Sequence, residues 1–281
     1  PGQYVNGVAP KYLESAKGSR VIDVDGNEFI DLNMAIGPIS LGYCYQKIDD
    51  AIKEQLDKGI TFSLMHRLEY EASALISEVV PNAEMVRISK SGADVCSAAI
   101  RVARAYTGRE KVLCCGYHGW HDWYITTTVR DGGIPSGTKE LIETFSYNDI
   151  DDFISKLDED IAAVILEPFI FEKPKNDFLE KIISLSEKNG TLVIFDEMWT
   201  GFRVALGGAQ EFFNLKADLA TFSKAVANGM PISFLTGKKE VMKLFDEDLF
   251  FFNTFGGEAL SLAATIATIK EMRETNYFDH I

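Results

Sequence analysis

Two apolar runs of this sequence lead to side chains that could do chemistry. Residues 191–195 are followed by Asp196 and Glu197, and the run 219–222 leads to Lys224. A carboxylate at the end of a buried strand is costly without a partner, and the protonated ring nitrogen of a cofactor is one such partner. Desolvation lowers the pKa of a lysine amine and makes it a nucleophile toward an aldehyde. The alternatives are a carboxylate in a surface turn or on a metal, and a solvated surface lysine.

A third segment has the residue types of an anion site. Ser91, Gly92 and Ala93 follow the apolar run 85–89 and open a helix predicted over 93–107. Gly92 lets a ligand approach the backbone closely, and the free N–H groups and dipole at a helix start favour a phosphate. An ordinary serine N-cap on a core helix would have the same sequence. The sequence alone leaves both interpretations open.

Other common ligand signatures are missing from the sequence. No two glycines are spaced G-x-G, and no G-x-x-x-x-G-K-[ST] loop occurs. A metal at Asp196 is disfavoured because His118 and His121 lie far away in the sequence and lack the H-E-x-x-H pattern. A phosphate would therefore need the helix start described above.

The elements that must position these residues alternate along the chain. Short apolar runs typical of buried strands occupy 85–89, 111–115, 162–166, 192–195, 219–222 and 232–235. Apolar residues at three- and four-residue spacings predict helices over 93–107 and 178–187. Near the beginning, 20–25 and 28–32 flank a Gly-Asn pair and predict a small hairpin. This alternation predicts an α/β fold with a mainly parallel sheet covered by helices on both faces. Ligands bind such sheets at the carboxyl ends of the strands.

Composition limits the possible partners. Lysine and arginine number 28 against 42 aspartates and glutamates, so the net charge of −14 disfavours a nucleic acid partner. The longest strongly apolar stretch, 259–269, is shorter than a membrane helix needs, and no secretory leader is seen. Four cysteines are too few for a disulfide framework, and we expect a reducing, cytoplasmic setting. Because the first residue is Pro1, we expect a sequence trimmed at its beginning.

The candidate residues together match one kind of site. A phosphate loop, a strand-end aspartate, a strand-end lysine and the aromatic segment Tyr117-His118-Gly119 form the set that a pyridoxal phosphate site needs. The chain resembles the class III aminotransferases, pyridoxal phosphate enzymes of fold type I, and within them the glutamate-1-semialdehyde 2,1-aminomutase-like branch. The matching stretches are AKGSRVIDVDGNEFIDL (16–32), SGADVCSAAIRVARAYTGREKV (91–112), GYHGWHDW (116–123), LEP (166–168), FDEMWTGFRVALGGAQ (195–210), FSKAVANGMP (222–231) and TFGGEALSLAAT (254–265). GFRVALGGAQ is the stretch that favours the aminomutase-like branch.

The resemblance implies roles for the residues around the cofactor ring. It implies that Lys224 forms the internal aldimine with the cofactor aldehyde and later moves the proton between substrate and cofactor carbons. It implies that Asp196 pairs with the pyridinium nitrogen, which makes the ring an electron sink. Tyr117 is expected to stack on the ring and to complete the catalytic set. Met198 is expected to pack on the opposite ring face, and His118 is expected beside the cofactor.

The resemblance also implies how the phosphate is held. Ser91, Gly92 and Ala93 match the phosphate loop. Thr254 matches a threonine that reaches the phosphate of the neighbouring subunit, so the resemblance implies a homodimer with shared active sites. Glu172 stands as a replacement for an asparagine or glutamate near the cofactor hydroxyl.

Some positions depart from the family pattern. The phosphate loop usually reads S-G-T-E-A, whereas this chain has Ala93 and Asp94, so a hydroxyl is missing there. Gly42-Tyr43 stands where Gly-His is common, and 227–229 reads Ala-Asn-Gly where glycines are common. These changes suggest a substrate other than glutamate semialdehyde. Family members continue with a carboxyl-terminal small domain, which we expect to be missing here: either the sequence is a fragment of something longer, or the protein has lost part of its site.

From these observations we expect an aspartate-aminotransferase-like fold with two parts. Residues 1–60 would hold the small hairpin and a helix, and residues 61–281 would form the large domain that binds pyridoxal phosphate. The implied function is amino-group transfer between a small-molecule amino donor and an aldehyde or keto acceptor, through a pyridoxamine phosphate intermediate. The transfer would occur within one molecule, as in an aminomutase, or between two. The alternative is a domain that keeps the fold with weak or no catalysis and serves as a structural partner.

Overall fold

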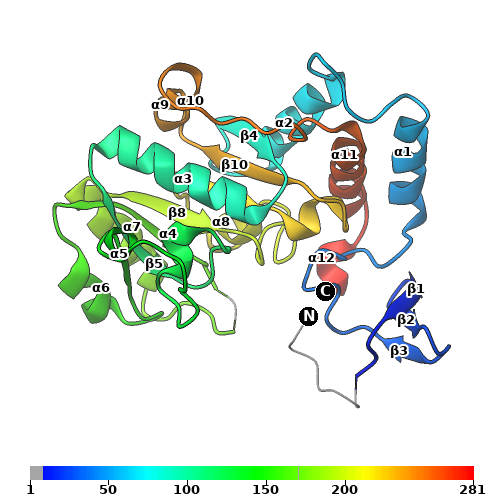
Figure 1. Ribbon diagram of the computed structural model, residues 1–281, viewed down its shortest axis with the longest axis horizontal. Helices are drawn as coiled ribbons and strands as arrows, with labels where there is room; N and C mark the ends of the chain where they lie inside the picture. The colour runs from blue at the N-terminus through cyan, green and yellow to red at the C-terminus, as the bar shows by residue number, and fades with distance from the viewer. Residues whose placement is uncertain (1–8, 170) are drawn as a thin grey trace.

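The computed structural model describes residues 9–169 and 171–281, which form two sheets (Figure 1). The strands are β1 (Leu13–Lys17), β2 (Arg20–Asp23), β3 (Glu28–Ile30), β4 (Met85–Ser89), β5 (Lys111–Cys115), β6 (Ile142–Thr144), β7 (Ile161–Leu166), β8 (Leu192–Asp196), β9 (Leu219–Phe222) and β10 (Ser233–Gly237). The longer helices are α1 (Gln46–Leu56), α2 (Arg67–Val79), α3 (Gly92–Thr107), α6 (Ile150–Lys156), α7 (Phe178–Asn189) and α11 (Ala259–Glu274). The shorter ones are α4 (Asp122–Ile125), α5 (Ser136–Lys139), α8 (Gly208–Phe213), the 3-10 helix η1 (Lys224–Ala227), α9 (Lys239–Met242), α10 (Leu244–Glu247) and α12 (Tyr277–His280).

The small sheet has the order β1-β2-β3 and is antiparallel. The predicted hairpin is confirmed by β2 and β3, whose turn is held by Asp23: its Oδ1 accepts the N–H groups of Asp25 at 3.0 Å and Asn27 at 2.8 Å. Gly26 supplies the left-handed conformation, with φ of 83°. β1 was not predicted because LESAK has no apolar alternation and is largely exposed. In Figure 1 this sheet lies apart from the large one, below α1 and α11.

The large sheet has the order β4-β10-β9-β8-β7-β5-β6. All six predicted strands are present, with ends within two residues of those expected. β6 was missed because three residues, of which one is apolar, give no pattern. The pairs among β9, β8, β7, β5 and β6 are parallel, whereas β10 is antiparallel to both β4 and β9. The predicted mainly parallel, mixed sheet is confirmed.

Alternate residues of the central strands enter two separate cores. Along β5, Val112 and Cys114 join the cluster under α3, and Leu113 and Cys115 join the cluster on the other face. Burial on both faces explains why these strands read as unbroken apolar runs. α3, α9 and α10 supply the first core, and α2, α7 and α11 supply the second. α3 crosses in front of the sheet in Figure 1.

The antiparallel β10 determines which strand ends meet. Because β10 reverses direction between β4 and β9, strand β4 points the same way as β9, β8, β7 and β5. Their carboxyl ends therefore lie along one edge of the sheet, and the segments that follow them gather there. Those segments begin with Lys90, Gly116, Glu167, Glu197 and Ser223. This edge is where the candidate residues must be sought.

Among the described residues, none of the helices has the length and apolar content that crossing a membrane requires.

Candidate active site

A buried pair of charged or polar side chains lies at the centre of the edge. Asp196 is the last residue of β8 and His118 follows β5, and both are almost fully buried. Asp196 Oδ2 lies 2.7 Å from His118 Nδ1. An ionised carboxylate only accepts hydrogen bonds, so with Asp196 in that form the donor of this hydrogen bond is His118 Nδ1. Asp196 Oδ1 accepts the N–H of Met198 at 3.1 Å, and His118 Nε2 is buried without a hydrogen-bond partner among the described residues.

Two further residues lie behind this pair. Cys96 on α3 places its Sγ 3.6 Å from Asp196 Oδ2 and 3.6 Å from the hydroxyl of Thr221 on β9. Burial and the charge of Asp196 raise the pKa of the Cys96 thiol well above its usual value. A neutral thiol is therefore a weak donor to the carboxylate. Neither residue was singled out from the sequence, because an isolated cysteine on an apolar helix face has the pattern of a core residue.

The predicted phosphate loop forms the start of α3. Ser91 caps the helix, with its hydroxyl accepting the N–H of Asp94 at 3.2 Å, while Asp94 Oδ2 accepts the N–H of Ser91 at 2.9 Å. The N-cap interpretation of Ser91 is thus confirmed. The cap still leaves other N–H groups of the first turn, those of Gly92 and Ala93, without intrahelical acceptors. Capping and anion binding are therefore compatible at this helix start.

Two glycines bring the neighbouring segments against this loop. A Cβ atom on Gly92 would lie 2.8 Å from Met198 Sδ, and one on Gly119 would lie 2.8 Å from Ala93 Cβ. Gly119 also has a φ of 100°, which favours glycine. The structure therefore brings the segment after β5 and the segment after β8 into contact with the phosphate loop.

Glu167, directly after β7, is a buried acid at the same edge. Its Oε2 accepts the N–H of Tyr117 at 2.8 Å, and its Oε1 is buried without a partner among the described residues. Burial and the nearby charge of Asp196 raise the pKa of Glu167 to about 7. Gly116 is required beside it, because a Cβ atom there would lie 2.4 Å from Glu167 Oε2. Glu167 was part of a matching stretch but was given no role from the sequence.

Lys224 opens η1 and reaches the same region. Its φ of 45° is left-handed, which is uncommon for a residue other than glycine and typical of functional sites. Burial lowers the pKa of its amine to about 8, although the charges of Asp196 and Glu167 oppose this shift. Lys224 Nζ lies 3.5 Å from the centroid of the Trp199 ring. Trp199 was not proposed from the sequence, where it was simply part of a matching stretch.

The remaining candidates have more exposed positions. Tyr117 is 58% exposed and makes an edge contact with Tyr124. Thr254 lies exposed in a turn whose neighbour Asn253 donates to Ser89 Oγ at 2.9 Å, beside the phosphate loop. Glu172 is half exposed and pairs with Lys175 at 2.5 Å, so the structure does not bring it into the buried group. The contacts of these side chains with a cofactor or a partner subunit remain predictions.

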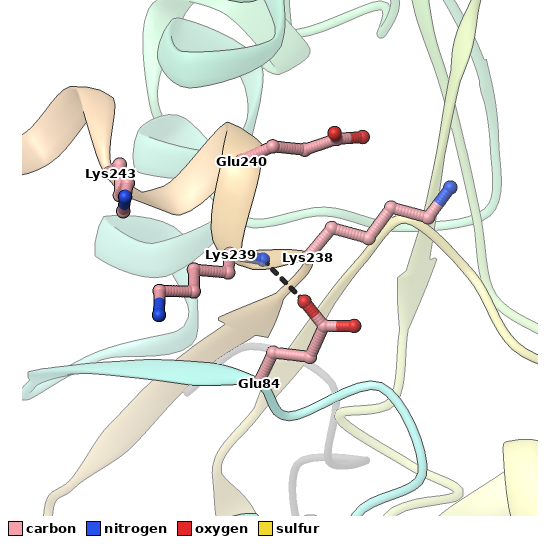
Figure 2. A pocket seen from close by; sticks show the side chains of 5 residues that line it. All are labelled: Glu84, Lys238, Lys239, Glu240 and Lys243. Atoms are coloured by element: carbon pink, nitrogen blue, oxygen red, sulfur yellow. Dashed lines mark hydrogen bonds between the residues drawn. The ribbon is translucent and has the colours of Figure 1, made fainter.

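A pocket lies at the opposite edge of the sheet. Figure 2 shows a pocket of about 470 Å³ lined by Glu84, Lys238, Lys239, Glu240 and Lys243. Its one hydrogen bond in this view joins the N–H of Lys239 to Glu84 Oε2 at 2.8 Å. Glu84 precedes β4 and Lys238 follows the antiparallel β10, so this pocket is separate from the candidate site.

The group at the carboxyl edge fits pyridoxal phosphate. A phosphate needs free N–H donors, which the start of α3 offers, and close backbone approach, which Gly92 permits. A protonated ring nitrogen needs a buried anion, which Asp196 supplies. An aldehyde needs an amine that loses its proton near neutral pH, and the pKa of Lys224 is about 8. The unpartnered Nε2 of buried His118 is consistent with a further group beside it.

Comparisons with known proteins agree with this arrangement. The family described as aminotransferase class-III matches residues 4–281. The 3-aminobutyryl-CoA aminotransferase of Cloacimonas acidaminovorans is 40% identical over 99% of this chain and 69% of its own length. The glutamate-1-semialdehyde 2,1-aminomutase of Acetivibrio thermocellus is 36% identical over 94% of this chain and 67% of its own length.

A solved structure also resembles this chain over most of its length. The FumI protein of Sphingopyxis sp. MTA144, in its PLP internal aldimine form, is 30% identical and superposes with a TM-score of 0.90. The match covers 99% of this chain and 68% of that protein. The aminotransferase-like fold expected from the sequence is therefore confirmed. Fold, site geometry and similarity together establish that this chain belongs to the class-III aminotransferase family, with pyridoxal 5'-phosphate as its cofactor.

Proposed function

We propose that this chain catalyses transfer of an amino group from a small-molecule amino donor to an aldehyde or keto acceptor. The observation that supports this most directly is the gathering at one sheet edge of Lys224, with its pKa lowered to about 8, and the buried carboxylate of Asp196. At pH 7 such an amine is unprotonated in about a tenth of the molecules. Relatives named as an aminotransferase and as an aminomutase represent transfer between two molecules and within one.

When bound, pyridoxal phosphate supplies an aldehyde that combines with amines and a protonated ring that takes up the electron pair left at a deprotonated carbon. Asp196 would keep the ring nitrogen protonated, because a buried anion stabilises the cationic form. His118 fixes the Asp196 carboxylate from the side through its Nδ1–H. Lys224 would hold the aldehyde carbon through its amine and, once displaced, would carry a proton between the donor carbon that bears the amino group and the cofactor carbon.

The phosphate is assigned to the helix start of α3. The N–H groups of Gly92 and Ala93 and the Ser91 segment would bind it, since the helix dipole favours an anion at this position. Tyr117 and Met198 are proposed to contact the two faces of the ring, and His118 its edge. Glu172 is proposed to lie near the cofactor hydroxyl. To contact that hydroxyl, it must first break its ion pair with Lys175.

The proposed assembly is a homodimer with shared active sites. Thr254 is exposed in its turn, as it must be to reach the phosphate of a second copy. Large apolar side chains near it are also exposed, among them Phe250 at 77% and Phe252 at 73%. Covering them would stabilise a dimer through the hydrophobic effect.

We also propose a division of the chain and a location. Residues 1–60 would form a segment that contributes the small sheet and α1, and residues 61–281 would form the part that binds the cofactor. A cytoplasmic location is supported by the thiols of Cys44, Cys96, Cys114 and Cys115, all four of which are free.

The proposed function is tested by the spectrum of the purified protein with pyridoxal phosphate. Amino donors should change the cofactor absorption, and keto or aldehyde acceptors should restore it. Conversion of glutamate 1-semialdehyde without a second substrate would identify transfer within one molecule. If a panel of α-, β- and ω-amino donors leaves the spectrum unchanged while the cofactor is bound, the proposed function is wrong.

A further inference from the structure

The aromatic ring of Trp199 lies against the amine of Lys224. Lys224 Nζ lies over the indole face, 3.5 Å from the ring centroid. An ammonium group over an aromatic face is attracted by the negative charge density of the ring, and tryptophan gives the strongest contact of this kind. A neutral amine lacks most of this attraction. The ring therefore distinguishes the protonated, unattached lysine from its other states.

The indole ring of Trp199 also packs against Gly37. A Cβ atom on Gly37 would lie 2.7 Å from Trp199 Cζ3, so the absence of a side chain at Gly37 makes room for the ring. Arg203 joins the two backbones: its Nε donates to the carbonyl oxygen of Trp199 at 3.0 Å, and its Nη2 donates to the carbonyl oxygen of Gly37. The indole ring is thus enclosed between the backbone of Gly37 and the amine of Lys224.

The segment that contains Gly37 is fixed next to η1. Asn228, four residues after Lys224, accepts the N–H groups of Ser40 at 2.9 Å and Leu41 at 2.8 Å. Asn228 Nδ2 also donates to the carbonyl oxygen of Gly42 at 3.0 Å. Hydrogen bonds therefore connect the segment that packs against Trp199 with the end of η1, the helix that bears Lys224.

We propose that Trp199 is a positioning residue for Lys224, holding the protonated amine on its indole face while the lysine is not attached to the cofactor. This inference rests on the proposed function, because it assigns Lys224 as the amine that acts. Four other titratable groups face that amine: Asp196 on β8, Glu167 after β7, Arg203 after β8, and Cys96 on α3. The carboxylates favour the charged amine, while Arg203 and burial disfavour it. The indole face, like the carboxylates, favours the protonated amine of Lys224 and so opposes the effect of burial on its pKa.

The test compares two substitutions of similar size. Trp199→Phe keeps an aromatic face, whereas Trp199→Leu removes it and keeps an apolar side chain. Both place a smaller apolar side chain at this position, and the main difference between them is the aromatic face. Trp120→Leu is the matched control, because Trp120 is 71% exposed.

The measurement is the pKa of Lys224 in the full chain without cofactor. Competitive acylation with acetic anhydride between pH 6 and pH 11, followed by mass spectrometry of the peptide that contains Lys224, gives this value directly. We expect the pKa in Trp199→Phe to exceed that in Trp199→Leu by about half a pH unit, from the usual strength of such contacts. Trp120→Leu should match the unmodified chain.

Equal values in the Phe and Leu variants, or a higher value in the Leu variant, would overturn the proposal. The same result in Trp120→Leu as in Trp199→Leu would overturn it as well. The labelling needs no cofactor and no turnover, so its outcome is separate from that of the proposed function. The proposed function is examined in the unmodified protein by borohydride fixation of pyridoxal phosphate to Lys224.

Discussion

Asp196 Oδ2 and His118 Nδ1 lie 2.7 Å apart in a fully enclosed pair, although the two residues are 78 positions apart in the chain. The pair forms because β5 and β8 both adjoin β7, and their carboxyl ends lie at the same edge of the sheet. The second oxygen of Asp196 is held by the backbone of Met198. The carboxylate is thereby fixed at both oxygens before any ligand arrives, which is the condition for electrostatic preorganisation.

Replacing this carboxylate should affect chemistry more than binding. We expect Asp196→Ala to slow the amino-donor half-reaction by on the order of 10²–10³-fold, while cofactor affinity falls by a smaller factor, since the phosphate contacts are unchanged. Stopped-flow absorbance and a cofactor titration measure the two effects. Asp246→Ala, at an exposed ion pair with Arg87, is the control. Equal half-reaction rates in Asp196→Ala and the unmodified protein would remove the proposed role.

The prediction for Lys224 concerns its covalent attachment to the cofactor and the pH dependence of the rate of attachment. Lys224→Ala should fold and bind pyridoxal phosphate without any bond that borohydride fixes, because the lysine supplies the amine and not the core. In the unmodified chain, covalent capture should speed up about tenfold per pH unit below pH 8 and level off above it, since the lowered pKa of about 8 sets the neutral fraction. Mass spectrometry after reduction measures both. Lys188→Ala on α7 is the control, and fixation to another lysine in Lys224→Ala would contradict the assignment.

Glu167 should make stability depend on pH. Its pKa is raised from 4.5 to about 7, so the folded chain binds this proton more tightly than the unfolded chain does. The favourable contribution is therefore complete below pH 4.5 and is lost as pH rises toward 7. At pH 8 the ionised carboxylate should cost about 3 kcal/mol relative to a neutral side chain, as an order of magnitude.

Glu167→Gln isolates this effect, because a glutamine oxygen still accepts the N–H of Tyr117. We expect the variant to exceed the unmodified protein in free energy of unfolding at pH 8 and to match it near pH 4.5. Urea unfolding of the cofactor-free chain at both values provides the comparison, with Glu159→Gln as a surface control. A variant that is less stable at pH 8 would show that the carboxylate charge is favourable in the fold.

We expect Thr254 to link dimer formation to cofactor binding. If its hydroxyl reaches the phosphate of a partner subunit, pyridoxal phosphate binds the dimer more tightly than the monomer and shifts the equilibrium toward it. Thr254→Val keeps the shape and removes the hydroxyl, and we expect cofactor affinity to fall by about tenfold, the value of one hydrogen bond to a charged group. Sedimentation with and without cofactor is the measurement. Tight binding by a monomer, unaffected by the substitution, would exclude shared sites.

The sequence predicted the central strands because burial on both faces leaves a local pattern. β5 and β7 read as unbroken apolar runs, and each was located almost to the residue. β1 and β6 were missed because their pairing is determined by neighbouring strands and not by their own residues. Asp196 and Lys224 could be proposed as site residues because a charged residue at or just beyond the end of an apolar run is visible in the sequence.

The contacts among site residues could not be predicted in this way. The positions of Cys96 and Trp199 against Asp196 and Lys224 depend on helix rotation and loop conformation, which depend on the whole core. Glu172 illustrates the converse: its place in the sequence suggested the cofactor, and the structure pairs it with Lys175 on the surface. Spacing predicts which edge a residue approaches, and packing determines what it touches.

The place of β4 in the sheet has a consequence for the order of folding. β4 is an edge strand whose one partner is β10, so residues 85–89 find their pairing only with residues 233–237. Closing so long a loop is slow compared with forming local contacts. During synthesis, the segment that begins at Ser91 stays without its final support until residue 237 has left the ribosome. The start of α3, which we propose as the phosphate site, would therefore be among the last parts of the sheet edge to reach its final form, and phosphate binding there would require a complete sheet.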